Sequence, residues 1–448
     1  MQREAMRSVA PPGSLAGRRL ARGRAPLTGD LLGSPRAQAR SAIVTPRILI
    51  LSWEYPPIVA GGLARHVCKL SEALVARGVE VHVLTRGGRE HELEELRAGV
   101  HIHRVAEKEM PLDLDAFVAW VEGMNAHMHA AGRQLGKRLR FDVVHGHDWL
   151  VAGAAAGLAE RLRCPYLTTI HATEFGRHQG WVDKHPQSYI HGIETWMAGR
   201  ADHVITCSHY MRGHVADVYD IDETRVTVIP NGIDPADLQP VADLDELRAR
   251  FAAPDERLVL LVGRLVYEKG FQIALDALPR VIRRAGKVRF LVAGSGTHEA
   301  ELRKQARTLG LMRHGTFMGW IGDDVLHSLY RIADLCVVPS IYEPFGLVAL
   351  EAMASGCPCI VADTGGLREV VPDNDAGLRF RSRDPRALAG MMRRVLTDDA
   401  LRDRLVAEAS AHVLSFDWAD VAEQTARVYA ELADAEPDSA RRATRRPA

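Results

Sequence analysis

From residue 47 onward, short apolar runs alternate with longer amphipathic stretches. Residues 48–52 form an apolar run of strand length, and residues 63–77 carry leucine and valine at helical spacing before Gly78. Further strand-like runs follow at residues 79–84, 143–144, 166–170, 204–207 and 226–229. Strands separated by helices predict parallel βαβ units and therefore an α/β fold with a doubly wound sheet.

A stretch rich in proline and acids, residues 231–255, interrupts this rhythm and predicts a hinge between two domains. A second series of the same kind follows it. Its expected strands are residues 258–262, 289–293, 316–318, 335–338 and 359–361, and its expected helices are 272–284, 299–309 and 346–355. The chain thus predicts two Rossmann-like domains with parallel sheets that face a shared cleft. Ligands of such sheets bind outside the carboxyl ends of the strands, so we expect the chemistry between the domains.

The two ends of the chain differ from this pattern. Eight arginines and two acids lie in residues 1–44 without apolar periodicity, which predicts a basic, disordered extension or sequence upstream of the true start. A tether to nucleic acid or lipid is the alternative. We expect one domain over residues 45–238 and a second over 239–416. An amphipathic helix over 417–434 precedes a frayed, arginine-rich tail at 435–448.

Composition excludes several function classes. The 57 basic and 57 acidic residues cancel, so we expect no nucleic acid as a partner and no general attraction to an anionic membrane. No apolar run is long enough to cross a membrane. The six cysteines are scattered, which fits a reducing, cytoplasmic compartment. The 20 histidines include pairs at i,i+2, but none has zinc-finger or HExxH spacing, so we expect no metal.

Two glycine-containing loops carry candidate chemistry. Gly61 and Gly62 open the helix after the first strand, where backbone N–H groups favour an anion, although a tight turn would use the same residues. Gly263 and Arg264 follow a later strand, and Lys269 comes five residues after Arg264. A guanidinium and an ammonium at one strand end suit a diphosphate. A surface ion pair of these cations with the neighbouring Glu268 is the alternative.

The segment 339–356 is the densest in candidate chemistry. Glu343 lies in a loop after a strand, Gly346 and Leu347 begin a helix, and Glu351 lies further along that helix. The free N–H groups at the start of this helix can receive a phosphate. The helix is too apolar for Glu351 to belong to a solvated face, which leaves a binding role or an internal salt bridge.

With these motifs in this order, the chain resembles the retaining glycosyltransferases of family 4, whose GT-B architecture has two facing Rossmann-like domains. The match covers residues 47–429. Its motifs are residues 61–62, 145–149, 169–171, 229–234, 263–264 with Lys269, and Glu343 with Glu351. Residues 53–57, 147–149 and 171–174 resemble the glycogen-synthase-like branch, which includes bacterial α-1,4-glucosyltransferases. The resemblance also implies that the helix 417–434 crosses back onto the first domain; an ordinary terminal helix of the second domain is the alternative.

The resemblance implies a hexosyltransferase that moves glucose from UDP- or ADP-glucose to the non-reducing end of an α-1,4-glucan, with retention and without a metal or other cofactor. The implied catalytic residues are Glu343, His171, Arg264, Lys269 and Asp148. The implied donor-binding residues are Gly61, Gly62, Arg264, Lys269, Trp320, Gly346, Leu347, Val348 and Glu351.

Within these sets, the implied role of Arg264 and Lys269 is to neutralise the donor diphosphate, and that of Glu351 is to hold the ribose. Glu343 and His171 are expected at the donor sugar. Asp148 is expected to orient sugar hydroxyls, and Trp320 to stack on the base. Whether any residue acts as a covalent nucleophile stays open.

One departure from the branch concerns the donor. Bacterial ADP-glucose-dependent synthases carry lysine two residues before the paired glycines, where this chain has Val59. The donor nucleotide, the acceptor and the oligomeric state therefore stay open. The alternative acceptor is a lipid or small molecule, as in phosphatidylinositol mannosyltransferases. A third hypothesis is a non-catalytic module that binds nucleotide sugars.

Overall fold

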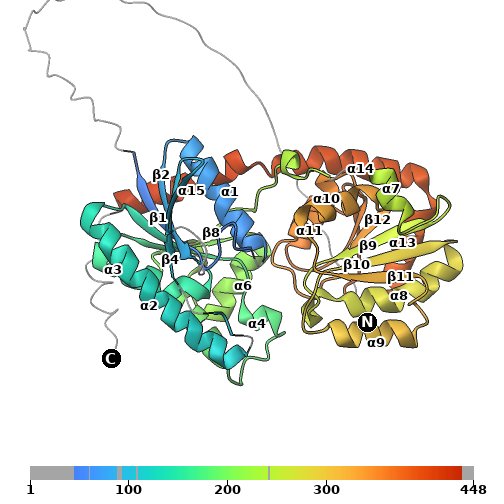
Figure 1. Cartoon of the computed structure of the whole chain (residues 1–448), viewed down its shortest axis with the longest axis horizontal. Helices are drawn as coiled ribbons and strands as arrows, with labels where there is room; N and C mark the ends of the chain where they lie inside the picture. The colour runs from blue at the N-terminus through green and yellow to red at the C-terminus, as the bar shows by residue number, and fades with distance from the viewer. Residues whose placement is uncertain are drawn as a thin grey trace, which may run out of the picture. The chain divides into compact units, whose positions relative to one another are not determined.

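The computed structural model describes residues 45–59, 61–87, 93–106, 109–111, 113–240 and 243–435. The basic extension 1–44 and the tail beyond residue 435 lie outside these ranges, so their expected disorder stays a prediction. Two sheets organise the described residues (Figure 1). We call the part around the first sheet the first lobe and the part around the second sheet the second lobe.

The first sheet has the strand order β3-β4-β2-β1-β5-β6-β7-β8 and is parallel except for the antiparallel pair β3–β4. Its strands are β1 (Arg47–Leu51), β2 (Glu80–Arg86), β3 (Glu94–Arg97), β4 (Val100–Val105), β5 (Val143–His147), β6 (Tyr166–Ile170), β7 (His203–Thr206) and β8 (Val226–Val228). The helices around it are α1 (Gly62–Ala76), α2 (Leu114–Arg138), α3 (Ala152–Leu162), α4 (Glu174–Arg177), α5 (Gln187–Arg200) and α6 (His209–Tyr219), with 3₁₀ turns η1 (Trp149–Val151) and η2 (Glu223–Arg225).

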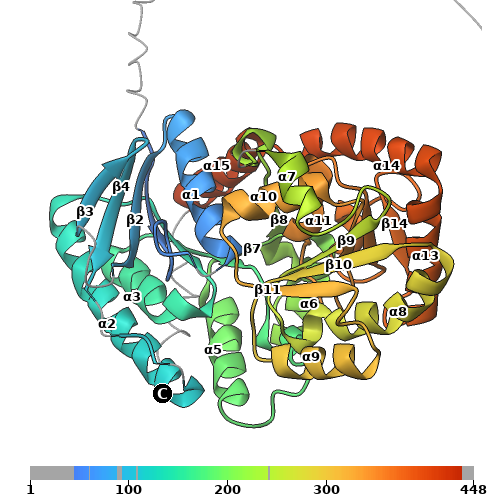
Figure 2. The same cartoon turned by 45° about the vertical axis from the view of Figure 1, so that its right-hand side comes forward.

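The second sheet is fully parallel, with the order β11-β10-β9-β12-β13-β14, the arrangement of a dinucleotide-binding fold. Its strands are β9 (Arg257–Val262), β10 (Val288–Ala293), β11 (Gly315–Gly319), β12 (Leu335–Val338), β13 (Cys359–Ala362) and β14 (Leu378–Phe380). Its helices are α7 (Leu244–Ala249), α8 (Phe271–Arg284), α9 (Glu299–Thr308), α10 (Asp323–Ile332), α11 (Leu347–Ala354), α12 (Leu367–Val370), α13 (Pro385–Thr397) and α14 (Asp399–His412), with 3₁₀ turns η3 (Pro235–Asp237), η4 (Tyr267–Lys269) and η5 (Val413–Ser415). Figure 2 shows α8 and α9 on one face of this sheet and α10 on the other.

Burial explains why these segments form strands and helices. Every residue of β5, β6, β12 and β13 is buried, as expected for parallel strands covered by helices on both faces. On α1 the buried side chains include Val67, Leu70 and Leu74, one stripe of an amphipathic helix. The prediction of two parallel, doubly wound sheets is therefore confirmed. The pattern did not predict β4 and the short, charged, antiparallel strand β3 at one edge of the first sheet, nor β14 at one edge of the second. It also did not predict the helix α7 inside the expected hinge.

The terminal helix α15 (Trp418–Asp434) packs on the first lobe, beside α1 (Figure 1). Its Val421 and Tyr429 belong to the apolar cluster that also contains Ile48 and Leu70. The hydroxyl of Tyr429 lies 2.8 Å from Nδ1 of His145 in the middle of β5. The second lobe is therefore connected to the first both through residues 231–240 and through α15.

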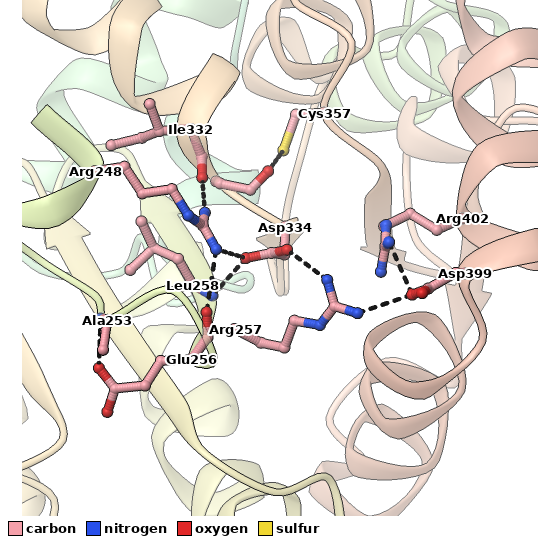
Figure 3. Close-up of polar contacts among 11 residues, drawn as sticks. Arg248, Ala253, Glu256, Arg257, Leu258, Ile332, Asp334, Cys357, Asp399 and Arg402 are labelled. Atoms are coloured by element: carbon pink, nitrogen blue, oxygen red, sulfur yellow. Dashed lines mark hydrogen bonds and ion pairs between the residues drawn. The ribbon is translucent and has the colours of Figure 1, made fainter. Parts of the chain in front are cut away.

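An ion network ties α7 to the second sheet (Figure 3). The carboxylate of Asp334, which precedes β12, accepts hydrogen bonds from Arg248 and from the backbone N–H of Leu258, each at 2.8 Å, and from Arg257 at 3.0 Å. Burial by itself raises the pKa of Asp334, but the Leu258 N–H and the two guanidinium groups outweigh it and hold this pKa below its ordinary value. Asp334 is therefore ionised at neutral pH and stabilises this corner of the lobe.

We expect Asp334→Ala to lower the free energy of unfolding at pH 7 by about 1–3 kcal/mol, because Arg248 and the Leu258 N–H lose a common acceptor. A depressed carboxyl pKa adds stability that is complete above the pKa of the unfolded state and lost as the pH falls through the folded value. The difference between wild type and variant should therefore shrink below about pH 4. Urea unfolding of wild type and variant at pH 7 and below about pH 4 measures this difference in the free energy of unfolding.

Asp399→Ala is the matched control, because Asp399 also pairs with Arg257, at 2.8 Å, but its side chain is 66% exposed. We expect a loss below about 1 kcal/mol for this exposed pair. Equal losses in the two variants would contradict the role given to Asp334.

Candidate functional site

The strand orders place the functional loops. In the second sheet the order reverses between β9 and β12, and in the first sheet between β1 and β5, and ligands bind at such points. The loop after β9 carries Gly263 and Arg264, and the loop after β12 carries Glu343. The loop after β1 leads to Gly61 and Gly62. Residues far apart in the sequence thus meet at the carboxyl ends of the strands.

A cavity of about 950 Å³ lies where these loops meet, and residues of both lobes line it. Ten of the residues implied by the sequence line it: Gly61, Gly62, His171, Arg264, Lys269, Trp320, Glu343, Leu347, Val348 and Glu351. Trp320, directly after β11, has a side chain that is 74% exposed at this opening. Asp148 and Gly346 are not among the lining residues and act on the cavity through their neighbours.

The second lobe presents a compact charged group. Nζ of Lys269, at the end of η4, lies 2.8 Å from Oε2 of Glu343, and the hydroxyl of Ser340 donates to the same oxygen at 2.9 Å. Glu343 is only 7% exposed, and because little water reaches it, these two donors fix the orientation of its carboxylate. Arg264 lies 3.9 Å from Glu268, a loose contact that leaves its guanidinium able to bind an anion. Desolvation in the cleft, followed by the charge of Arg177, lowers the pKa of Arg264.

Two helix starts approach each other across the cavity. A Cβ atom built on Gly62, the first residue of α1, would lie 2.8 Å from Cδ1 of Leu347, the first residue of α11. Gly346 precedes α11 with φ 118°, a conformation that favours glycine, and its own Cβ would meet Leu367 at 2.6 Å. Both helices therefore direct their free N–H groups and the positive ends of their dipoles toward one space, which suits a phosphate.

Glu351 takes part in an internal ion pair and also lines the cavity. Its carboxylate accepts hydrogen bonds from Arg65 of α1 and from the hydroxyl of Tyr330, both at 3.1 Å. Burial raises the pKa of Glu351, and Arg65 opposes this shift. Arg65 also pairs with Asp323 at the start of α10. The salt bridge considered as an alternative for Glu351 is thus present, and it joins the two lobes at the wall of the cavity.

In the first lobe, Asp148 holds the loop that carries His171. Oδ1 of Asp148 accepts a hydrogen bond from the backbone N–H of His171 at 2.8 Å. Burial raises the pKa of Asp148 to about 6, and the nearby Arg177 opposes the shift. Asp148 also has φ 59°, an uncommon backbone conformation for a residue other than glycine. The carboxylate lies behind His171, where it fixes the position of the histidine relative to the cavity.

Sequence reasoning missed several residues of the cavity wall. Arg177 of α4 lines the cavity and lies 3.6 Å from Glu174, and its charge also acts on Asp148. His66 of α1 and Asn231 line the same cavity. The spacing of Arg177, six residues after His171 and beyond a strand end, is the one signal that could have indicated it. His66 lies within a regular amphipathic helix, so the sequence offered no signal for it.

Each of the two lobes matches a sequence family. Residues 60–237 match the family described as Glycosyltransferase Family 4, and residues 243–412 match the family described as Glycosyl transferases group 1. No helix among the residues that the structure describes is long and apolar enough to cross a membrane.

Curated relatives cover most of the chain. It is 40% identical over 400 residues to a glycogen synthase of Mycobacterium tuberculosis, a match that covers 86% of this chain and 94% of that protein. It is 34% identical over 393 residues to a D-inositol 3-phosphate glycosyltransferase of Frankia alni, covering 83% of this chain and 94% of that protein. Among solved structures, a sucrose-phosphate synthase from Thermosynechococcus elongatus superposes with a TM-score of 0.73 at 26% identity, over 86% of this chain and 99% of that one.

The backbone of Glu343 packs closely against Gly365. Gly365 has φ 53°, and a Cβ atom there would lie 2.1 Å from the carbonyl oxygen of Glu343, which also accepts the N–H of Gly366 at 2.9 Å. We expect Gly365→Ala to lower the free energy of unfolding by about 3 kcal/mol or more, since the strain of a positive φ adds to a backbone clash. Thermal or urea unfolding measures this loss.

Gly310→Ala is the control, because Gly310 has φ 68° but no atom within 4 Å of the position that a Cβ would take. This variant should cost only about 1–2 kcal/mol, the strain alone. A loss of the same size at both positions would show that the backbone of Glu343 is not held by close packing against Gly365.

Proposed function

This chain belongs to the family 4 glycosyltransferases and has their GT-B fold, and we propose that it moves glucose from a nucleotide sugar to the non-reducing end of an α-1,4-glucan. The donor is UDP- or ADP-glucose, and the α-configuration is retained. The observation that carries the proposal is the convergence of Arg264, Lys269 and the start of α11 on one cavity wall, opposite Gly61 and Gly62.

The proposed chemistry places the donor diphosphate against that wall. When the acceptor hydroxyl attacks the anomeric carbon, the bond from that carbon to the diphosphate breaks and negative charge grows on the leaving group. Arg264, Lys269 and the N–H groups at Leu347 and Val348 are fixed before the reaction, so they stabilise this charge without reorganisation. The leaving phosphate takes the proton of the acceptor hydroxyl. Because these groups supply the positive charge, we propose that no metal ion is required.

The sugar lies between the lobes in this proposal. Glu343, oriented by Lys269 and Ser340, binds hydroxyls of the glucose near the anomeric carbon. His171, positioned by Asp148, faces the same ring from the first lobe. Glu351 binds the ribose hydroxyls with the oxygen capacity that Arg65 and Tyr330 leave free, since a carboxylate has about four acceptor positions. Trp320 is exposed at the opening and stacks on the base.

Identity to a glycogen synthase supports a glucan as the acceptor. The six cysteines are free and buried, which supports a reducing, cytoplasmic location. Val59 lines the cavity in place of the lysine expected for an ADP-glucose-dependent enzyme, so both nucleotides belong in the test. A second candidate acceptor is an inositol phosphate. Two observations favour this acceptor. The chain is 34% identical to a D-inositol 3-phosphate glycosyltransferase, and the cationic Arg177 beside His171 could bind the phosphate.

The acceptor is tested with purified protein and radiolabelled UDP- or ADP-glucose. We expect maltooligosaccharides to be extended by α-1,4-linked glucose, and inositol phosphate and phosphatidylinositol vesicles to remain unmodified. Transfer to inositol phosphate without extension of the glucan would overturn the acceptor assignment and keep the transferase chemistry. Tight binding of the nucleotide sugar without transfer to any acceptor would favour a non-catalytic module.

Lys269→Ala and Arg264→Ala should each lower kcat by on the order of 10²–10³, because each removes one preorganised cation from the departing diphosphate. Glu343→Ala should lower kcat by a similar factor, since it removes the carboxylate that binds and orients the donor sugar. Initial-rate kinetics measure these changes, and circular dichroism checks that the variants fold.

Lys304→Ala is the control for charge removal, because Lys304 lies exposed on α9 and is not a lining residue of the cavity. It should keep wild-type kcat and KM. Normal turnover in Lys269→Ala would refute the diphosphate site.

A further inference from the structure

Three histidines meet at the floor of the cavity. His66 lies on α1, His147 ends β5, and His171 follows β6. Because β5 and β6 are parallel neighbours with His147 paired to Thr169, their carboxyl ends bring His147 and His171 together. One ring nitrogen of each histidine lies within 4.8 Å of those of the other two.

The nitrogens of this cluster are only partly used. Nδ1 of His147 lies 3.0 Å from Nε2 of His171, a distance that two ligands of one ion can adopt when each bond is about 2.0–2.1 Å. Nε2 of His147 and Nδ1 of His66 are buried without a hydrogen-bond partner among the described residues. His147 is fully buried and His66 is 7% exposed. Buried polar atoms without a partner are costly, and a cation in this cluster would take one nitrogen from each of the three rings.

The cluster is open to solvent on one side. His66 and His171 line the cavity of about 950 Å³, whereas His147 lies behind them. An ion held by three imidazoles would therefore keep one coordination position directed toward the cavity. Three histidines with one open position form a typical zinc coordination set, and imidazole nitrogen also suits cobalt, nickel and copper. Mg²⁺ prefers oxygen ligands and is not expected here.

We propose that His66, His147 and His171 bind a transition metal ion of the zinc type, and that the bound ion inhibits sugar transfer. Inhibition rests on the proposed function, because His171 is placed there at the donor sugar and an ion on its ring occupies that space. Binding itself rests only on the three side chains. The ion is an inhibitor and not a cofactor. This agrees with the proposed reaction, in which Arg264 and Lys269 stabilise the leaving diphosphate and no metal ion is required.

A second cluster, Glu80, His82 and His101, provides a comparison. Its ligand atoms also lie within 4.8 Å of one another. However, the carboxylate of Glu80 already accepts hydrogen bonds from Nε of Arg47 at 2.6 Å and from Nη2 of Arg47 at 2.8 Å. A carboxylate paired with a guanidinium is less available to a metal ion. We therefore assign the site to the first cluster, and His101→Ala becomes a matched control.

Binding is tested first, without nucleotide or acceptor. Protein stripped with a chelator is titrated with Co²⁺, whose visible absorption becomes intense in four-coordinate nitrogen sites. We expect one strong site in the wild type and in His101→Ala. His66→Ala and His147→Ala should each weaken binding by at least about tenfold, since each removes a ligand. Unfolding curves of the variants show that the loss does not come from misfolding.

Inhibition is tested second, in the transfer assay, with each variant compared with its own rate without metal. Micromolar Zn²⁺ should inhibit the wild type and His101→Ala, EDTA should reverse the inhibition, and Mg²⁺ should have no effect. His66→Ala should need at least about tenfold more Zn²⁺. An unchanged Co²⁺ spectrum in both His66→Ala and His147→Ala, or its loss in His101→Ala, would overturn the site. Failure of transfer in all proteins with Co²⁺ binding intact would instead count against the proposed function.

Discussion

The start of α1 lies directly against the start of α11, where Gly62 approaches the side chain of Leu347. At this point the first turn of α1 and the first turn of α11 come so near that a Cβ atom on Gly62 would lie 2.8 Å from Cδ1 of Leu347 and would displace that side chain. Both helices follow strands at reversal points of their sheets, so the carboxyl edges of both sheets open into one space. The positive ends of two helix dipoles then face the same volume, and backbone alone makes it favourable for an anion.

Side-chain charges refine this backbone field. Lys269 and Arg264 add positive charge at the wall of the second lobe, while Glu343 and Glu351 are each held by a cation and a hydroxyl donor. Such pairing keeps a buried carboxylate in one orientation, whereas a carboxylate exposed to solvent rotates freely. The ion pair of Arg65 with Glu351 also spans the lobes, so the charge pattern of the cavity and the contact between the lobes are coupled.

The first lobe supplies a different kind of surface. Its strand ends carry neutral imidazoles and the partly protonatable Asp148, whose pKa is raised by burial to about 6. Imidazoles suit sugar hydroxyls because the two exchange hydrogen bonds without the desolvation of an ion, and the cationic Arg177 lines the same wall. In the proposed function the two lobes divide the tasks: the second presents charge to the leaving diphosphate, and the first presents imidazoles to the sugar. Unpaired ring nitrogens of the same wall give it the capacity for a metal ion.

Local patterning was enough to predict the two parallel sheets and the loops that follow their strands, because continuous apolar runs and helical stripes are properties of neighbouring residues. It also indicated the cations and carboxylates after β9 and β12, since glycine and charge at strand ends form short motifs. Only the packed chain shows that Arg65 pairs with Glu351 and that His66 and Arg177 reach the cavity. Residues 65 and 351 lie beside separate sheets, and no periodicity within one helix encodes which surface that helix will meet. The direction of the Asp148 carboxylate toward His171 likewise depends on an uncommon backbone angle at Asp148. The packing of the folded chain imposes this angle, and the local sequence does not predict it.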